Sequence, residues 1–317
     1  MTGRVGYFLR ATEAVYSVIR SYLPDAFELV TLGREGSRAE VEAARGLDFI
    51  IGVRCPRAML DAAPGLRLFQ LPGVGYDMLD PGLLAERGVP LAQAGVGSSE
   101  EVAEHAMMLM LAVSRRLVEL DRSVREGHWW MFERRMQCHS LRGRTLGIVG
   151  MGQIGRQVAR RAVAFGMRIL HHDPVPVEGW KHATLDALLA ESDIVTLHMP
   201  VTPATRHLLN GMRIAAMKPG AILINTARGA LVDEAALLDA LVSGHLAGAG
   251  LDVFETEPTS AANPLLAFPQ VVVTPHVATG TAESLHDKAA YYAENIRRVL
   301  RGEEPLGLVK VPPTPSP

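Results

Sequence analysis

The second half of the chain holds three side chains whose types could act together on a small organic acid: Arg228, Glu257 and His276. The planar fork of an arginine can hold the carboxylate and carbonyl oxygens of a 2-oxo acid together. A histidine, whose pKa is ordinarily about 6.5, can give a proton to a new alkoxide or remove one near neutral pH. A carboxylate bonded to that histidine would orient its ring and favour its protonated form. The three residues therefore predict carbonyl reduction or the reverse oxidation.

Each of these residues also has an ordinary structural explanation. Arg228 could be one of many turn arginines, and His276 is one of eleven histidines. Glu257 could be a loop glutamate, and Glu255 lies two positions away as a rival partner for the histidine. The spacing along the chain does not show that Glu257 reaches His276.

A glycine-rich segment follows a strand-like apolar run, Leu146–Val149, and leads into helical spacing over Gln153–Phe165. In this context Gly150 permits a tight turn, Gly152 lets the backbone approach a pyrophosphate, and Gly155 lets helix and strand pack closely. The N–H groups at the helix start would bind the phosphates. The glycines alone are a weak signal, because glycine-rich turns are common in α/β proteins.

Asp173 strengthens the dinucleotide interpretation. It ends the next strand-like run, Met167–His172, eighteen positions after Gly155. An acid about twenty residues beyond the glycines can accept hydrogen bonds from ribose hydroxyls. Its charge would repel a 2′-phosphate, so the sequence favours NAD over NADP. The alternative is a strand-end turn residue before Pro174, and the neighbouring histidines are interpreted as structural.

These residues need a scaffold of parallel strands, and the apolar pattern predicts one. Short continuous apolar runs alternate with helical spacing along the whole chain, which is typical of α/β proteins whose sheets are covered on both faces. Arg228 and His276 follow two such runs, at the strand ends where α/β proteins bind their ligands. The expected strands are Arg4–Leu9, Leu47–Val53, Leu66–Leu71, Thr145–Gly150, Met167–His172, Ile194–His198, Ala221–Asn225 and Gly248–Val253.

Two long helical segments divide the chain. One is expected from Ser99 to Glu126 and the other from Thr281 to Arg301. If both link the domains, residues 1–98 and 282–317 form one discontinuous domain and residues 99–281 form the other. The proline-rich stretch 311–317 is expected to be disordered.

The bulk properties exclude several classes of protein. The formal net charge of −2 gives no overall attraction to nucleic acid or to an anionic membrane. Cys55 and Cys138 lack the spacing of a metal site, so no metal is expected. The apolar stretch Ala106–Val113 is far shorter than the roughly 18 residues of a membrane span, and the short apolar run at the N-terminus is not a typical leader. A cytoplasmic protein is expected.

The chain resembles the D-isomer-specific 2-hydroxyacid dehydrogenases. The motifs that carry the resemblance are Leu141–Gly155, Ser192–Pro200, Met217–Glu234 (MKPGAILINTARGALVDE), Gly248–Pro258 (GAGLDVFETEP), Thr274–Ala278 (TPHVA), Gly73–Asp77 and Val102–His105. The resemblance implies two Rossmann-like or flavodoxin-like doubly wound parallel-sheet domains with the active-site cleft between them. It also implies a homodimer built largely through the nucleotide-binding domain.

The resemblance implies a role for each matched residue. Arg228, Glu257 and His276 match the catalytic residues, and Glu257 is preferred to Glu255 because it directly precedes a proline. Val74 and Gly75 match the loop whose N–H groups hold the substrate carboxylate. The cofactor positions are Gly150, Gly152, Gly155, Gln153 and Ile154 for the pyrophosphate, Asp173 for the adenosine ribose, His198, Pro200 and Thr205 for the cleft lining, and Thr226, Ala227, Arg228, Asp252, His276 and Ala278 around the nicotinamide.

The implied activity is the NAD(H)-dependent interconversion of a 2-oxo acid and a D-2-hydroxy acid, as in glyoxylate or hydroxypyruvate reductases. The alternatives are an NAD(H)-sensing corepressor of the same fold and a formate or phosphite dehydrogenase. The stretches Arg54–Pro56 and Ala94–Ser99 depart from the usual family pattern and leave the choice of acid open. The aromatic segment Gly127–Phe132 either lies in a dimer interface or lines the partner's active site.

Overall fold

The structure, a computed structural model, describes residues 2–32 and 37–310. The contacts between residues divide the chain into two units, Met1–Ser98 with Gly280–Pro317, and Ser99–Thr279. The proline-rich stretch 311–317, for which disorder is expected, lies outside the described residues. Both units are α/β structures built on a parallel sheet, so the predicted fold class is confirmed.

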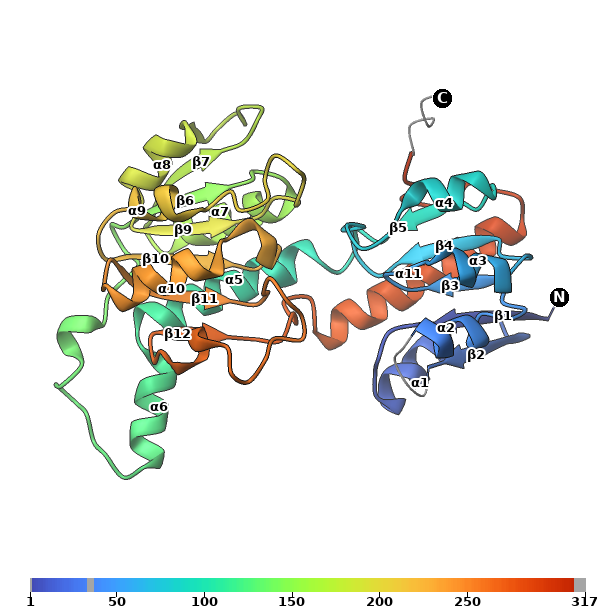
Figure 1. Cartoon of the computed structure of the whole chain (residues 1–317), viewed down its shortest axis with the longest axis horizontal. Coiled ribbons are helices and arrows are strands. Elements are labelled where there is room, and N and C mark those ends of the chain that lie inside the picture. The colour runs from blue at the N-terminus through green and yellow to red at the C-terminus, as the bar shows by residue number, and fades with distance from the viewer. Residues whose placement is uncertain (1, 33–36, 311–317) are drawn as a thin grey trace. The chain divides into compact units, whose positions relative to one another are not determined.

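The first unit contains, in its described residues, a parallel sheet in the order β2-β1-β3-β4-β5 (Figure 1). Helices α1 and α11 cover one face and helices α2, α3 and α4 contribute to the core on the other. The strands are β1 (Gly3–Tyr7), β2 (Phe27–Thr31), β3 (Phe49–Ile51), β4 (Leu68–Leu71) and β5 (Leu91–Gln93). The helices are α1 (Glu13–Tyr22), α2 (Ser37–Ala43), α3 (Arg57–Ala62), α4 (Pro81–Glu86) and α11 (Ala282–Leu300).

The sequence pattern missed the two outer strands of this sheet. Strand β2 is half-buried or exposed at every position and contains Glu28, so it has no continuous apolar run. Strand β5 has only three residues. Strand β2 is paired on one side and is shielded less completely, so the apolar pattern that marks central strands weakens there. Strand β5 is buried at Leu91 and Ala92 but is too short to form a recognisable apolar run.

The second unit has a sheet in the order β12-β11-β10-β9-β6-β7-β8, again with parallel pairing in the described residues. Helices α8, α9 and α10 pack on one face, and α5 and α7 pack on the other. The strands are β6 (Thr145–Val149), β7 (Arg168–His172), β8 (Lys181–His182), β9 (Ile194–Leu197), β10 (Ala221–Asn225), β11 (Leu246–Leu251) and β12 (Val271–Val273). The helices are α5 (Ser99–Ser114), α6 (Leu117–Arg125), α7 (Gln153–Ala164), α8 (Leu185–Glu191), α9 (Gly211–Ala215) and α10 (Glu234–Val242).

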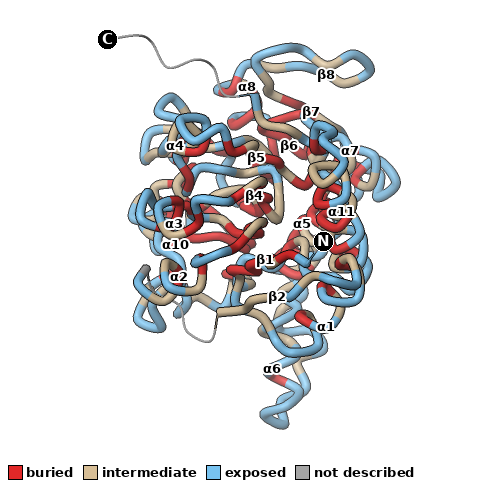
Figure 2. Tube along the Cα trace, turned by 90° about the vertical axis from the view of Figure 1, so that its right-hand side faces the viewer, coloured by how far each residue is buried: buried red, intermediate tan, exposed pale blue. Residues whose placement is uncertain are grey.

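The central strands of both sheets are buried, and the outer surfaces of the helices are exposed (Figure 2). Every residue of β6, β9 and β10 is buried, because helices cover both faces of the sheet. Strand β6 is the point at which the chain changes direction across this sheet. The strands β7 and β8 extend from one side of it, and β9 to β12 extend from the other. Ligands of open α/β sheets bind at such a point, outside the carboxyl ends of the strands.

The expectation of one continuous helix from Ser99 to Glu126 is wrong. The helix ends at Ser114, and Arg116 has a left-handed backbone with φ of 49° before α6 begins. The carbonyl groups at the break accept hydrogen bonds from a later segment of the chain. The His139 N–H donates to the Ser114 carbonyl at 2.8 Å, and the Cys138 thiol donates to the Arg115 carbonyl at 3.4 Å. These tertiary hydrogen bonds end the helix where the local sequence would continue it.

In residues 2–32 and 37–310, no helix combines the length and the apolar character that crossing a membrane requires.

Candidate active site

The glycine segment lies directly after β6, at the change of direction in the sheet. Gly150 has φ of 97°, and a Cβ there would lie 2.4 Å from the carbonyl oxygen of His198. A Cβ on Gly155 would lie 2.2 Å from the carbonyl oxygen of Gly150. Only glycine fits these two positions. At Gly152 the space is open instead, since no atom of the described residues lies within 4 Å of a Cβ built there.

Helix α7 starts immediately after this turn. Gly152 is its N-cap, and among the described side chains none caps the helix. The N–H groups of the first helical turn, which include those of Gln153 and Ile154, therefore lack partners within the helix. Such groups together with the helix dipole form an anion site. The open space at Gly152 and these donors fit a pyrophosphate.

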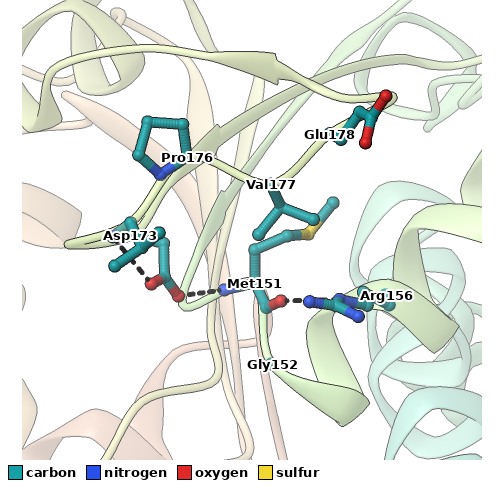
Figure 3. A pocket seen from close by; sticks show the side chains of 8 residues that line it. Met151, Gly152, Arg156, Asp173, Pro176, Val177 and Glu178 are labelled. Atoms are coloured by element: carbon teal, nitrogen blue, oxygen red, sulfur yellow. Dashed lines mark hydrogen bonds between the residues drawn. The ribbon is translucent and has the colours of Figure 1, made fainter.

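Asp173 lies beside the glycine turn and lines a pocket of about 440 Å³ (Figure 3). Its carboxylate accepts a hydrogen bond from the Met151 N–H at 2.8 Å. On the other side of the same residue, Arg156 Nε donates to the Met151 carbonyl at 3.2 Å. A carboxylate has about four acceptor positions, so Asp173 can still receive ribose hydroxyls. The pocket lining is Met151, Gly152, Arg156, Asp173, Val175, Pro176, Val177 and Glu178.

His171 holds the segment that forms one wall of this pocket. Its ring is fully buried, with Nδ1 bonded to the Lys181 carbonyl at 3.1 Å and Nε2 accepting from the Val177 N–H at 3.2 Å. Because Nε2 accepts, the proton of the neutral ring lies on Nδ1. Burial, followed by the charge of His182, lowers the pKa of His171. This histidine is structural, as expected, yet it supports a residue that lines the pocket.

The expected cleft residues after β9 lie in one loop. His198 Nε2 is bonded to the Thr196 hydroxyl at 2.9 Å, while its Nδ1 is buried with no partner in the described structure. Burial lowers the pKa of His198 to about 3, so its ring is neutral. Thr205 donates its hydroxyl to the Pro200 carbonyl at 2.9 Å and accepts from the Thr202 N–H at 2.7 Å. Thr205 therefore stabilises the loop that carries Pro200.

The three residues with acid–base and anion-binding chemistry follow neighbouring strands of the same sheet. Arg228 follows β10, Glu257 follows β11 and His276 follows β12. Because neighbouring parallel strands end at the same edge, their following loops meet there. The structure places His276 Nδ1 2.7 Å from Glu257 Oε2. Glu257 Oε1 accepts from the Phe254 N–H at 3.0 Å, which fixes the carboxylate.

This geometry assigns the ring nitrogens of His276. The carboxylate can only accept, so Nδ1 donates and Nε2 is the nitrogen able to face a substrate. The hydrogen bond that His276 donates to Glu257 is the largest effect on the pKa of His276 and raises it, against burial and the charge of Arg228. Burial would raise the pKa of Glu257, but hydrogen bonds to His276 and Phe254 with the charges of His276 and Arg228 lower it. The pair therefore favours a protonated ring beside an ionised carboxylate.

Glu255, the rival by sequence, contacts other groups. It lies 3.1 Å from His207 Nε2, and it accepts from the Glu234 N–H at 3.0 Å. Its carboxylate therefore ties two loops together, and Glu257 is the glutamate that the structure brings to His276.

Gly229 is a site residue that the sequence interpretation missed. A Cβ at this position would lie 1.8 Å from the Phe254 carbonyl carbon and 2.0 Å from its oxygen. The turn that carries Arg228 thus packs with no spare space against the segment that carries Glu257. Its position directly after Arg228 was the one feature of the sequence that could have indicated this role, but a glycine in a loop has many explanations.

The surroundings of Asp252 are those of a structural residue and not of one that contacts a ligand. It exposes none of its surface, and its carboxylate accepts from the N–H groups of Val277 at 2.9 Å and of Ala278 at 2.9 Å. It therefore holds the turn that contains His276. Directly after the neighbouring strand β10, the Thr226 hydroxyl is buried with no partner in the described part of the chain, and the Ala227 N–H is held by Asn225 at 3.1 Å.

The expected carboxylate-binding loop belongs to the other unit. Val74 and Gly75 follow β4, and Val74 is 50% exposed.

In the chain as described, no group of three His, Cys, Asp or Glu side chains is arranged to hold a metal ion.

The comparisons with known proteins agree on one family. Residues 107–278 match the family described as D-isomer specific 2-hydroxyacid dehydrogenase, NAD binding domain. A glyoxylate reductase of Korarchaeum cryptofilum is 44% identical over 79% of this chain and 78% of its own length. A D-3-phosphoglycerate dehydrogenase of Methanocaldococcus jannaschii is 40% identical over 84% of this chain, which spans about half (51%) of that protein.

The architecture is also that of a solved structure. The TT0316 protein from Thermus thermophilus superposes with a TM-score of 0.88 and 37% identity, over 97% of this chain and 100% of the other. Family match, sequence identity and fold point the same way, and the chain belongs to the D-isomer-specific 2-hydroxyacid dehydrogenase family.

Proposed function

We propose that the protein is an NAD(H)-dependent 2-ketoacid reductase that interconverts a small 2-oxo acid and the D-2-hydroxy acid. The observation that carries the proposal is the 2.7 Å hydrogen bond between His276 and Glu257, beside Arg228 and at the same sheet edge as the glycine turn. The similarity to a glyoxylate reductase supports a small 2-oxo acid of the glyoxylate or hydroxypyruvate type.

In this proposal each side chain has one task. Arg228 binds the substrate carboxylate and carbonyl through its two-pronged guanidinium. His276 polarises the carbonyl through Nε2 and gives it a proton as C2 is reduced; in the reverse direction it takes that proton back. Glu257 orients the ring and favours its charged form. Nicotinamide adenine dinucleotide, when bound, supplies or accepts the hydride.

The residues of the second unit fit that cofactor. The first-turn N–H groups of α7 would hold the pyrophosphate, and the Asp173 carboxylate would hold the adenosine ribose in the neighbouring pocket. The buried hydroxyl of Thr226 would gain a partner from the nicotinamide half. We further propose a preference for NADH over NADPH, because a 2′-phosphate would meet the negative charge of Asp173.

Residues 99–281 would then be the NAD-binding domain, and residues 1–98 with 282–317 the substrate domain. We also propose a homodimer. Helix α6 and the segment after it expose large apolar side chains, including Trp129 at 76%, Met131 at 67% and Phe132 at 64%. Light scattering of the purified protein tests this, and a monomer at micromolar concentration would contradict it.

The decisive experiment is oxidation of NADH and of NADPH with a panel of 2-oxo acids: glyoxylate, hydroxypyruvate, pyruvate and bulkier branched or aryl acids. We expect turnover with at least one acid and a preference for NADH. His276→Gln should lower kcat by orders of magnitude while NADH still binds, because the proton donor is lost but the nucleotide site is intact. Tight NADH binding without turnover of any acid would favour an NAD(H)-sensing scaffold instead.

A further inference from the structure

His276 lies in a turn with an unusual backbone. Its φ is 53°, in the left-handed region that residues with a Cβ rarely adopt. Such a conformation persists only when the surrounding structure holds it, and it sets the direction in which the imidazole leaves the backbone.

Asp252 is the direct support. Its carbonyl oxygen accepts from the His276 N–H at 2.7 Å. Its two carboxylate oxygens accept from the next two N–H groups, those of Val277 and Ala278. The carboxylate is fully buried, so it needs further donors to stay charged and in place.

The Thr274 hydroxyl is such a donor, and His105 in turn donates to Thr274. The Thr274 hydroxyl donates to Asp252 Oδ1 at 2.6 Å, and His105 Nε2 lies 2.8 Å from the same hydroxyl oxygen. A hydroxyl has one proton, and it goes to the carboxylate, so His105 Nε2 must be the donor to Thr274. His105 Nε2 is also 3.5 Å from Asp252 Oδ1, and the side chain of His105 is only 13% exposed.

His105 comes from α5, which packs along β10 and β11 and is part of the buried core of its unit. The residue before it, Glu104, faces outward and pairs with Arg161 of α7 at 3.1 Å. The helix therefore carries a donor into the interior at a defined position. Nothing in the chemistry assigned to Arg228, Glu257 and His276 accounts for a largely enclosed histidine there.

We propose that His105 is a positioning residue for His276, acting through the hydroxyl of Thr274 and the carboxylate of Asp252. The inference rests on the proposed function, in which His276 is the acid–base. Without the Nε2 donor the Thr274 hydroxyl is free to rotate away from Asp252, and the turn loses one of the groups that hold it. The ring of His276 then departs from Glu257, and a misplacement of about 1 Å is enough to cost on the order of 10²-fold in rate.

The test compares two substitutions at one position. His105→Leu removes the donor, whereas His105→Gln places an amide N–H near the position of Nε2. We expect His105→Leu to lower kcat by roughly 10- to 100-fold with little change in the KM for NADH, and His105→Gln to recover most of that loss. Glu104→Gln, one residue away on the exposed side of α5, is the matched control and should leave kcat unchanged.

A second measurement does not depend on turnover. The titration of His276 by NMR reports its contact with Glu257, and the other charged groups that face it are Arg228 and Asp252. In His105→Leu the pKa of His276 should move down toward its ordinary value, because the Glu257 hydrogen bond is weakened. Thr274→Val, which keeps the shape and removes the hydroxyl, should have the same effect, while Thr274→Ser should not.

The outcomes separate the two proposals. If the wild type reduces none of the 2-oxo acids but the His276 titration still responds to His105→Leu and Thr274→Val, the proposed function fails and the positioning role stands. If the wild type is active but His105→Leu leaves both kcat and the His276 titration unchanged, the positioning role is overturned. Equal losses in the Leu and Gln variants, with a lowered melting temperature in both, would show a packing role and also overturn it.

Discussion

Replacing Gly229 by alanine should separate the two loops of the candidate active site. The added Cβ would lie 1.8 Å from the Phe254 carbonyl carbon, whereas ordinary contact begins at 3.4 Å, so the two backbones must part by about 1.6 Å. The obstacle is main chain rather than a flexible side chain, so a rotamer change cannot relieve it. The Phe254 N–H holds Glu257, so the displacement passes directly to the partner of His276.

The size of the effect follows from that displacement. Overpacking of a well-packed interior typically costs about 1–3 kcal/mol of unfolding free energy. Misplacement of reacting groups by about 1 Å can cost on the order of 10²-fold in rate. We therefore expect Gly229→Ala to lower kcat for the preferred 2-oxo acid by at least about 10²-fold and to lower the unfolding free energy by roughly 1–3 kcal/mol.

The assay is NADH-dependent turnover, with NADH binding and urea denaturation measured on the same samples. NADH should still bind, because the glycine turn and Asp173 follow other strands, β6 and β7. Gly211→Ala is the matched control: it adds the same methyl in the same unit, where the nearest atom is 3.7 Å away. Turnover within about threefold of the wild type and an unchanged unfolding free energy in Gly229→Ala would refute the reasoning, since the backbones would then part without consequence.

Three other perturbations follow from the site. Asp173→Ala should raise the kcat/KM for NADPH relative to NADH by removing a negative charge from the ribose site; an unchanged ratio would contradict that role. Glu257→Gln should lower kcat and move the alkaline limit of carbonyl reduction to lower pH, because Glu257 is the main group that raises the pKa of His276; a pH–rate profile at the wild-type position would argue against the pairing. The folded state keeps His171 neutral by lowering its pKa, so the unfolded chain binds more protons below about pH 6.5 and stability falls as the pH drops through that range. Between pH 7.5 and 5.5 (about one unit to either side of 6.5), the unfolding free energy measured with urea should fall less in His171→Gln than in the wild type. Equal falls in the two proteins would contradict the lowered pKa of His171.

Much of the sheet architecture could be predicted because central strands carry their own signal. Strand β10 is apolar at every position but the last, and it is buried throughout because helices cover both faces of the sheet. The edge strands β2 and β5 lack that signal and were missed. The break between α5 and α6 was missed for another reason. It is produced by hydrogen bonds from residues 138–139, which no local pattern at Arg115 and Arg116 encodes.

The candidate site divides in the same way. The types and order of Gly150, Asp173, Arg228, Glu257 and His276 predicted the chemistry that we propose, because each side chain has intrinsic properties that its neighbours along the chain do not change. Sequence alone could not pair His276 with Glu257 on physical grounds, since they are 19 positions apart and Glu255 lies only two positions farther away.

What the sequence by itself determined is the set of chemical groups, the strand–helix alternation and the family to which they belong. What only the tertiary structure decided is which groups meet. The order of β10, β11 and β12 brings their loops to one edge, and the contact at Gly229 sets how closely two of them pack. Hydrogen bonds that run from His105 through Thr274 to Asp252 support the turn of His276. These are distances between residues far apart along the chain, and they arise only when the strands take their places in the sheet.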